Sequence, residues 1–311
     1  MPERINSTVL DDAGLTAFFA RELESIKAQT YDVKRPPLNA MRLIPVSSEA
    51  GPAAETIVYR QWDATGIAKI IANYADDLPR ADVKAREFVA RVRSIGNAYG
   101  FSLQEIRASE SQGKGLDQRK ASAALRSQEE LWNDIGFNGD ETHGLQGLFD
   151  NPNIPSEEVE NDGEGDATEW STKTPDQILR DMNDFVHDVN TRTNGVERPD
   201  TLVLPLEQFS LISSTPRSDT SDTTILEFFL RNNRFITSVE SAHELAGSGP
   251  AGEDQMWTYP RSPEFLTLEM PQMFEQLPVQ ERNLEFVVPC HSRIGGVIVY
   301  YPFAMAFAYG I

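Results

Sequence analysis

Few side chains in this sequence could carry out chemistry, and their spacing matches no common catalytic pattern. Of the four histidines, His143 has two acidic neighbours, Asp140 and Glu141, in the segment GFNGDETHGLQGLFDNP (residues 136–152). A metal site needs further ligands, and no other His or Cys lies close by in the sequence. Gly, Asn, Asp and Pro are frequent in this segment, so a structural turn is the alternative to an active-site or metal loop.

Two other histidines stand beside residues that could assist them. Cys290 and His291 are neighbours in an expected strand. Consecutive strand residues point to opposite faces, so the two are not expected to act as a nucleophile and its base, and Cys290 is expected to be a buried structural residue. His243 and Glu244 begin like the zinc motif H-E-x-x-H, but Gly247 occupies the place of the second histidine.

Two loops resemble ligand-binding motifs and fail in their details. The stretch GSGPAG (247–252) has the G-x-G-x-x-G spacing, yet Pro250 stands where a helix should begin, so we expect a flexible surface loop. DGEGDATE (162–169) begins like a calcium loop, but Ala167 occupies the glycine position and Lys173 the position of the final glutamate. We expect a solvated acidic loop there, and we predict no catalytic residue, metal site or cofactor.

Composition and charge exclude several classes of protein. The 311 residues include 48 acidic and 28 basic side chains, which gives a formal net charge of −20. Proteins that coat nucleic acid or anionic membranes rely on Lys and Arg, so neither role is expected. Cys290 is the only cysteine, so no disulfide can form within the chain, and the opening MPERINSTVLDDAGL lacks the pattern of a signal peptide. The length suffices for a sizeable core, in one large or two ordinary domains.

The uncharged segment 294–311 tests whether the chain enters a membrane. It reaches the lower limit of a transmembrane helix, which is about 17–25 residues. However, Gly295 and Gly296 precede a run of β-forming residues, and Pro302 would interrupt a helix. We therefore expect two buried strands rather than a membrane anchor.

The first third of the chain predicts unusually extended structure. Apolar spacing predicts a helix over 11–30, and a proline-rich stretch then predicts a strap outside any compact core. Residues 53–82 predict a long two-stranded hairpin with its turn between Ala64 and Asp77. Each arm could span about 35–45 Å at ~3.3 Å per residue, against a radius of gyration of about 19–20 Å for a compact protein of this size. Because an isolated hairpin is marginal in water, we expect it to reach a neighbour rather than wrap its own domain.

The rest of the chain mixes helices and strands. Residues 86–95 alternate like a strand, Ser102 and Glu105 form the capping box of a short helix, and an apolar stripe predicts the longest helix over 116–137. An acidic, turn-rich segment at 154–173 is then expected to be a boundary. The elements predicted after it are a helix capped by Thr174 and Pro175, a buried strand at 200–205, helices at 206–213 and 223–233, a strand at 234–241, and several strands after 255. Strict βαβ alternation does not occur, so the fold class is α+β.

In this order the elements resemble the major capsid protein of tailed bacteriophages, whose fold is shared with encapsulins and herpesvirus capsid floors. The likeness covers most of the chain. It rests on the hairpin, the capped helix SLQEIRAS, the long helix LDQRKASAALRSQEELWNDIGF, its exit NGDETHGLQGL and the terminal RIGGVIVYYPFAMAFAYGI. The pairing of NGD and GLQGL with GGVIVYYP is the most specific part. The resemblance implies that the segment 136–152 is a structural turn that leads the chain off the long helix.

The resemblance also implies how the chain is divided. The expected parts are an N-terminal arm at 1–52, an extended loop at 53–85, a peripheral domain at 86–170 with its spine helix at 116–137, an axial domain at 171–254, strands returning to the peripheral domain at 255–289, and C-terminal axial-domain strands at 290–311.

The implied function is structural rather than enzymatic. Hexamers and pentamers of the chain would form an icosahedral shell around double-stranded DNA, held without sequence-specific binding, in a virion assembled in the host cytoplasm. Scaffolding, portal and decoration proteins are candidate partners, and no membrane is expected. The extended loop would contact a neighbouring subunit through Tyr59, Trp62, Ile67, Ile70 and Ile71. The alternatives are an encapsulin-type compartment shell and a soluble α+β enzyme whose site the motifs do not reveal.

Overall fold

The computed structural model describes residues 34–65, 82–112, 119–218, 220 and 222–311. The chain divides into two compact units, residues 1–37 and residues 38–311, and every element described below belongs to the second. The helix expected at 11–30 and the turn of the hairpin lie outside the described residues.

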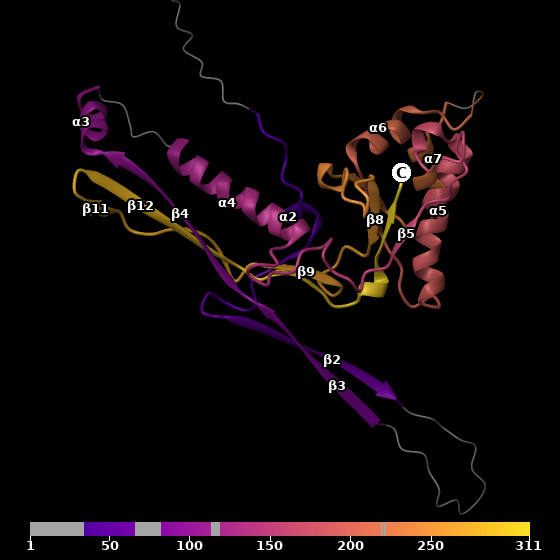
Figure 1. Cartoon of the computed structure of the whole chain (residues 1–311), viewed down its shortest axis with the longest axis horizontal. Helices are drawn as coiled ribbons and strands as arrows, with labels where there is room; N and C mark the ends of the chain where they lie inside the picture. Colours follow the sequence, from indigo (N-terminus) through magenta and orange to yellow (C-terminus); the bar gives the residue numbers. More distant parts are fainter. Residues whose placement is uncertain (1–33, 66–81, 113–118, 219, 221) are drawn as a thin grey trace, which may run out of the picture. The chain divides into compact units, whose positions relative to one another are not determined.

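The longest described helix, α4 (Arg119–Asn138), runs along a sheet (Figure 1). This sheet consists of β10 (Gln272–Gln276), β12 (Glu285–Ile294) and β11 (Gln280–Arg282), with β4 (Arg93–Ser102) also paired to β12. Buried residues of α4 recur at steps of three and four, at Ala124, Gln128, Trp132 and Ile135. Trp132 donates its indole N–H to Ser292 Oγ on β12 (3.2 Å), which ties the helix to the sheet. The helix predicted at 116–137 is confirmed from Arg119 onward, and residues 116–118 lie outside the described part.

The predicted strand at 86–95 is wrong in its extent, because two strands meet there. β3 (Asp82–Arg91) pairs with β2 (Thr56–Thr65), whereas β4 pairs with β12. Between β3 and β4, Val92 is buried and its N–H donates to the carbonyl of Glu55 (2.9 Å). The more buried residues of β3 have even numbers, whereas most of those of β4 have odd numbers. The chain therefore turns its other face inward at Val92, as it passes from the hairpin into the sheet.

The two helix caps predicted from sequence are confirmed. At α3 (Leu103–Gln112), the N–H of Ser102 donates to Glu105 Oε2 (2.9 Å) and the N–H of Glu105 donates to Ser102 Oγ (3.2 Å). At α5 (Pro175–Arg192), the N–H of Thr174 donates to Gln177 Oε1 (2.7 Å). Such caps depend on neighbouring residues only, and for that reason they can be read from sequence.

A five-stranded sheet separates two hydrophobic cores. Its order is β5 (Ser156–Glu158), β14 (Ala306–Tyr309), β8 (Gln255–Tyr259), β6 (Thr201–Leu204) and β7 (Ser238–Ser241). Leu202 and Met256 pack in the core that contains α5, α6 (Leu206–Ser214) and α7 (Ile225–Asn232). The residues that follow them, Val203 and Trp257, pack in the core that contains α4. Because both faces of the sheet are covered, the inner strands β6 and β8 are buried at every position, whereas the edge strands β5 and β7 carry Ser and Glu.

The expectation of a strap outside the core is wrong for residues 38–47. These residues form α2 (Ala40–Leu43) and β1 (Val46–Ser47), and Leu43 and Ile44 are fully buried. β1 joins β9 (Leu266–Glu269) and β13 (Gly296–Val299) in a three-stranded sheet. The prolines bend the chain but do not remove the apolar residues between them from the core.

The uncharged C-terminal segment is confirmed as buried strands, β13 and β14, joined by the short η3 (Pro302–Ala304). No helix among the described residues is long and apolar enough to cross a membrane. The strand pairing differs from the expected division of the chain. β5 and β8 lie in one sheet with β6 and β14, so the expected boundaries at 170/171 and 254/255 cut this sheet, and β13 pairs outside it.

Candidate assembly surface

The β2–β3 hairpin has two faces of different character. The strands pair in register from Thr56↔Arg91 to Thr65↔Asp82. Alternate residues therefore share a face. We call the face with Ile57, Tyr59, Gln61, Arg86, Phe88 and Ala90 the pinned face, and the face with Val58, Arg60, Trp62, Val83, Ala85, Glu87 and Val89 the apolar face.

The pinned face is held by the rest of the same subunit. The ring of Tyr59 stacks on Phe88 (centroids 5.1 Å apart, planes at 13°) and meets Tyr300 edge to face at 5.1 Å. Ile57 lies close to Gly295, where a side chain on the glycine would approach Ile57 Cδ1 to 3.2 Å. Burial, with the nearby Tyr300, raises the pKa of the Tyr59 hydroxyl. Tyr59 therefore anchors the hairpin to its own subunit.

The large apolar side chains of the apolar face are more than half exposed within the described residues. Trp62 is 64% exposed, Val89 63%, Val83 56% and Val58 52%. Arg60 Nε and Glu87 Oε1 form an ion pair across the strands at 2.7 Å, and both side chains are more than half exposed. Four large apolar side chains on one face of a two-stranded ribbon are unusual for a surface that stays in water.

The structure brings together only part of the predicted contact set. Trp62 lies on the apolar face, Tyr59 lies on the pinned face against Tyr300, and Ile67, Ile70 and Ile71 lie outside the described residues. Val58, Val83 and Val89, which the sequence analysis did not name, share this exposed face with Trp62. The sequence carried a signal for them, because successive residues of a strand alternate between its two faces. In the observed register, the even positions of β2 and the odd positions of β3 lie on the same face.

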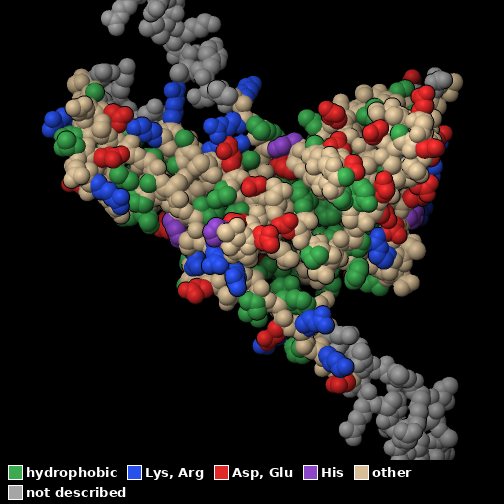
Figure 2. Space-filling model, viewed as in Figure 1, with side chains coloured by type: hydrophobic (Ala, Val, Ile, Leu, Met, Phe, Trp, Pro, Cys, Tyr) green, Lys and Arg blue, Asp and Glu red, His purple; other side chains and the backbone are tan. Residues whose placement is uncertain are grey.

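A groove of about 900 Å³ borders the pinned face. Its walls include Tyr59 and Phe88 of the hairpin, and opposite them Val196 and Phe303, whose side chains are 76% and 60% exposed. Figure 2 shows hydrophobic side chains gathered where the hairpin joins the rest of the unit. Exposed apolar residues thus occur on both sides of the hairpin near its root.

The segment 136–152 is a structural turn. Asp140 and Leu145 exchange backbone hydrogen bonds (2.8 and 2.9 Å), and Gly139 adopts a left-handed φ of 72°. Leu145 and Leu148 are buried. His143 Nδ1 lies 2.6 Å from Asp140 Oδ2, and hydrogen bonding to His143 lowers the pKa of Asp140.

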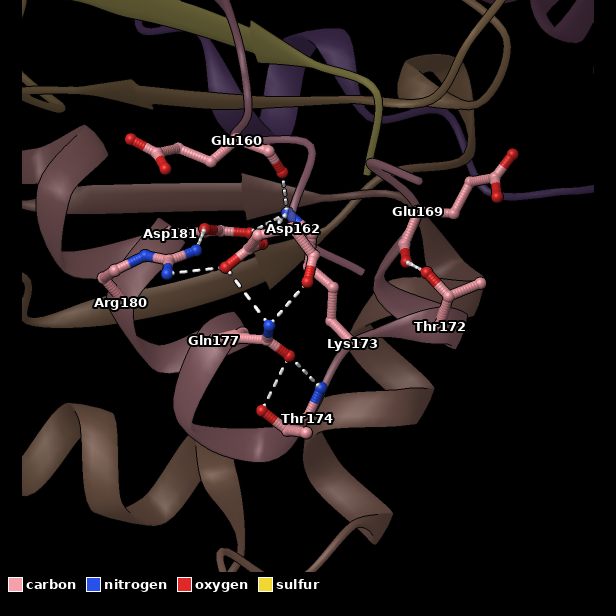
Figure 3. A network of polar contacts seen from close by, with 9 residues as sticks. All are labelled: Glu160, Asp162, Glu169, Thr172, Lys173, Thr174, Gln177, Arg180 and Asp181. Atoms are coloured by element: carbon pink, nitrogen blue, oxygen red, sulfur yellow. Dashed lines mark hydrogen bonds and ion pairs between the residues drawn. The ribbon is translucent and has the colours of Figure 1, made fainter. Parts of the chain in front are cut away.

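The acidic segment 162–169 is exposed at Glu164, Asp166 and Glu169, as expected, but its first residue, Asp162, is held by ion pairs. Figure 3 shows Asp162 held by Arg180 and Lys173, at 2.6 and 3.4 Å. Arg180, with help from Lys173, lowers the pKa of Asp162 to about 2. Lys173 itself is fully buried and binds Asp181 Oδ2 (2.6 Å) and the carbonyl of Glu160 (2.5 Å). Lys173 stands where a calcium loop would supply its last carboxylate, and here it neutralises the acids instead.

The remaining candidate side chains have structural surroundings. Cys290 is buried in β12 and burial raises its thiol pKa, whereas His291 points to the other face. His243 contacts Asn39, whose amide also donates to Glu244 Oε2 (2.7 Å). In the part of the chain that the structure describes, no group of three His, Cys, Asp or Glu residues could hold a metal ion.

Comparison with known proteins gives a consistent result. The family model for the major capsid protein matches residues 66–311. No curated protein matches the chain in sequence. The structure is similar to the capsid of Myoviridae phage XM1 (TM-score 0.79, 17% identity, covering 94% of this chain and 98% of that one). It is also similar to a chain from Mycobacterium phage Ogopogo (TM-score 0.60, 14% identity, covering 97% of this chain and 99% of that one). A third similar structure is the capsid of a native GTA particle (TM-score 0.64, 9% identity, covering 98% of this chain and 99% of that one).

The structural likeness confirms the predicted α+β capsid fold, and the family match covers most of the chain, including the hairpin's second strand, α4 and the C-terminal strands. Self-association into shells and a place in the virion follow at the level of the family. The chain belongs to the major capsid protein family and is a structural protein of the capsid shell.

Proposed function

We propose that copies of this chain form the hexamers and pentamers of a closed icosahedral shell around the double-stranded DNA of a tailed phage, assembled in the host cytoplasm. The observation that carries this proposal is the β2–β3 hairpin. It is anchored on its own subunit through Tyr59 and Tyr300, and its other face leaves Trp62 and three valines exposed. A two-stranded ribbon has only marginal stability on its own in water, so we expect a neighbouring subunit to cover this exposed face.

The elements suggest roles within the shell subunit. We assign α4 and the sheet of β4 and β12 to the peripheral domain, with α4 as its spine helix. We assign the five-stranded sheet with α5, α6 and α7 to the axial domain, and the hairpin to the extended loop. These assignments are supported by the separate hydrophobic cores on the two faces of the five-stranded sheet. They place β5 and β8 in the axial domain, which changes the boundaries expected from sequence.

The proposed partners are other copies, with portal, scaffolding and decoration proteins as further candidates. DNA would be enclosed without sequence-specific binding and without a catalytic reaction. The net charge of −20 supports a wall that does not hold DNA tightly, because electrostatic binding to duplex DNA depends on Lys and Arg. Figure 2 shows acidic side chains spread over the region of α5, α6 and α7.

The test is whether the purified chain forms particles. Sedimentation, light scattering and electron microscopy should show closed shells of uniform size. A single species near 34.7 kDa under all assembly conditions, with scaffolding protein supplied where the host system has one, would refute the proposal.

A further inference from the structure

We propose that the open edge of β5, together with an acidic groove between β5 and α5, binds an extended basic segment of a different protein, which adds to the five-stranded sheet as a further strand. The partner is defined by its chemistry, as a polypeptide that carries Lys or Arg at alternate positions. This inference goes beyond the proposed function, because it assigns a recognition site to the single subunit.

β5 lies at the edge of its sheet and leaves main-chain groups without partners. Towards β14, the carbonyl of Pro155 accepts and the N–H of Val159 donates, at 2.9 and 3.1 Å. Successive strand residues direct these groups to opposite edges, so the N–H and C=O of Ser156 and Glu158 point away from β14. Both residues are exposed, and within the described residues these groups form no hydrogen bond. An extended peptide can satisfy them by adding a strand.

The opposite edge of the same sheet is partly covered. At β7, Arg42 donates from Nη2 to the carbonyl of Ser241 (2.7 Å) and also forms an ion pair with Glu240. The side chain of Arg42 therefore occupies main-chain and charged groups that a partner strand would need. In the part of the chain that the structure describes, no side chain covers the edge of β5 in this way, so β5 is the better place for an added strand.

A groove of about 400 Å³ lies beside this edge, with walls from β5 and α5 (Figure 1). Glu157 pairs with Ala308, which packs in the core that contains α5, so the Glu157 side chain lies on the α5 side of the sheet. From α5, Asp184, His187 and Asp188 line the other wall. A side chain of an added strand that points towards α5 would therefore enter this groove.

The groove carries an excess of negative charge. Two of its acids are already neutralised, Asp181 by Lys173 and Asp188 by Arg192. The others form no ion pair within the described residues, and they are Glu157, Glu158, Glu160 and Asp184. Burial raises the pKa of Glu157, although the nearby Arg192 acts in the opposite direction. A Lys or Arg of a partner would stabilise these carboxylates in their charged form.

Charge favours a basic partner over a second copy of this chain. Copies with a net charge of −20 repel each other. Like charges that face each other across paired strands destabilise the pairing, and opposite charges stabilise it. The acids along β5 and α5 therefore reject acidic strands and select basic ones.

The first experiment measures the binding of synthetic peptides to dispersed subunits by fluorescence anisotropy. The probe is a fluorescein-labelled peptide of about eight residues in which lysine and valine alternate, and a peptide with glutamate in place of lysine is the charge control. We expect only the lysine peptide to bind. Its dissociation constant should rise several-fold between about 50 and 300 mM salt, because salt screens exposed charges.

Two further peptides separate strand addition from simple electrostatic attraction. One is N-methylated at every lysine and the other at every valine, so that both keep all their charges. Because alternate residues of a strand direct their N–H groups to opposite edges, only one of the two should lose the hydrogen bonds to β5. We expect that peptide to bind about tenfold or more weakly than the parent, and the other to bind within about threefold of it.

Matched variants of the chain test the site itself. Glu158→Pro removes the N–H on the open edge but leaves the hydrogen bonds to β14, whereas Glu158→Gln removes the same carboxylate and keeps the N–H. The proline variant should bind the lysine peptide about tenfold more weakly than the glutamine variant. Asp184→Asn should weaken binding several-fold, and Glu281→Gln on the distant β11 should leave it unchanged. Circular dichroism checks that each variant is folded.

Three results would overturn the inference. The first is equal binding of the lysine and glutamate peptides, or no binding of either. The second is an equal effect of the two N-methylation patterns, which would show that backbone pairing plays no part; this result is obtained on the wild-type chain, even if Glu158→Pro fails to fold. The third is self-association of dispersed subunits that the lysine peptide competes away, because it would assign the edge to a second copy. None of these results bears on whether the chain forms shells, which the particle assays decide separately.

Discussion

Removing the carboxylate of Asp181 should destabilise the fold more than any single change at the surface. The side chains of Lys173 and Asp181 are 0% and 1% exposed, and Nζ lies 2.6 Å from Oδ2. Asp181→Ala would leave the Lys173 ammonium buried with Asp162 at 3.4 Å as its remaining carboxylate. Breaking a buried pair in this way costs about 3–5 kcal/mol, and the second carboxylate places our expectation at about 3 kcal/mol.

The measurement is denaturant unfolding of dispersed subunits, followed by tryptophan fluorescence. Trp170 stands close in sequence to Lys173 and is buried, so it reports on this region. The double variant Lys173→Met/Asp181→Leu should recover most of the lost free energy of unfolding, because apolar side chains can replace a whole buried pair at little cost. Glu87→Gln is the matched control, since its ion pair is exposed and should matter by less than about 1 kcal/mol.

The result that would refute this reasoning is a loss below about 1 kcal/mol for Asp181→Ala. It would mean that water reaches the Lys173 ammonium and that the pair behaves like a surface pair. A double variant as unstable as the single one would refute the second step, because it would show that the ions support the loop around Glu160 and Asp162 through their hydrogen bonds rather than merely compensating each other.

Further predictions concern pH, packing, the hairpin and DNA. Asp162 has a lowered pKa of about 2 in the fold against an ordinary 3.8, so its stabilisation is present above about pH 4 and is lost as the pH falls through about 2; Asp162→Asn should flatten the pH dependence of unfolding in that window. Gly147→Ala should destabilise the fold by about 1–3 kcal/mol, because an added Cβ would lie 2.6 Å from the carbonyl oxygen of Phe137; thermal melting measures this. Replacing residues 56–74 by a short Gly/Ser turn should leave a folded core by circular dichroism but impair shell formation, although it also removes the Tyr59–Tyr300 contact, worth about 0.5–1.5 kcal/mol. Dispersed subunits should not shift duplex DNA in a gel at about 50 mM salt. Micromolar, salt-sensitive binding would contradict a shell that encloses DNA without binding it tightly.

Features set by neighbouring residues could be predicted from the sequence. The caps at Ser102 and Thr174 and the apolar stripe of α4 depend on spacings of three and four residues. The C-terminal strands were also predictable, because β-forming residues follow two glycines and Pro302 excludes a long helix. Each of these signals is complete within about ten residues of sequence.

Features set by distant partners could not be predicted. The core position of Leu43 and Ile44 depends on Asn39, whose backbone N–H donates to Asn133 Oδ1 of α4 (2.8 Å). The break at Val92 appears only when one strand pairs with β2 and the next with β12. The ion pairs of Asp162 could not be predicted, because their partners, Lys173 and Arg180, lie beyond the end of the acidic segment. In each case the deciding contact is made by a residue that the local pattern does not include.

The root of the hairpin determines where its apolar face can reach. Ile57, Tyr59 and Val92 fix the root against Gly295, Tyr300 and the buried core. A ten-residue strand spans about 33 Å, so a rotation of about 5° at the root would move its far end by about 3 Å. Under the proposed function, we expect the surface that receives the apolar face to be a different patch of the neighbouring copy. Such head-to-tail contacts close into rings only when the angle between copies repeats accurately. We therefore expect the aromatic contact of Tyr59 with Tyr300 to affect assembly through the direction of the hairpin, and Trp62 and the valines to affect it by direct contact.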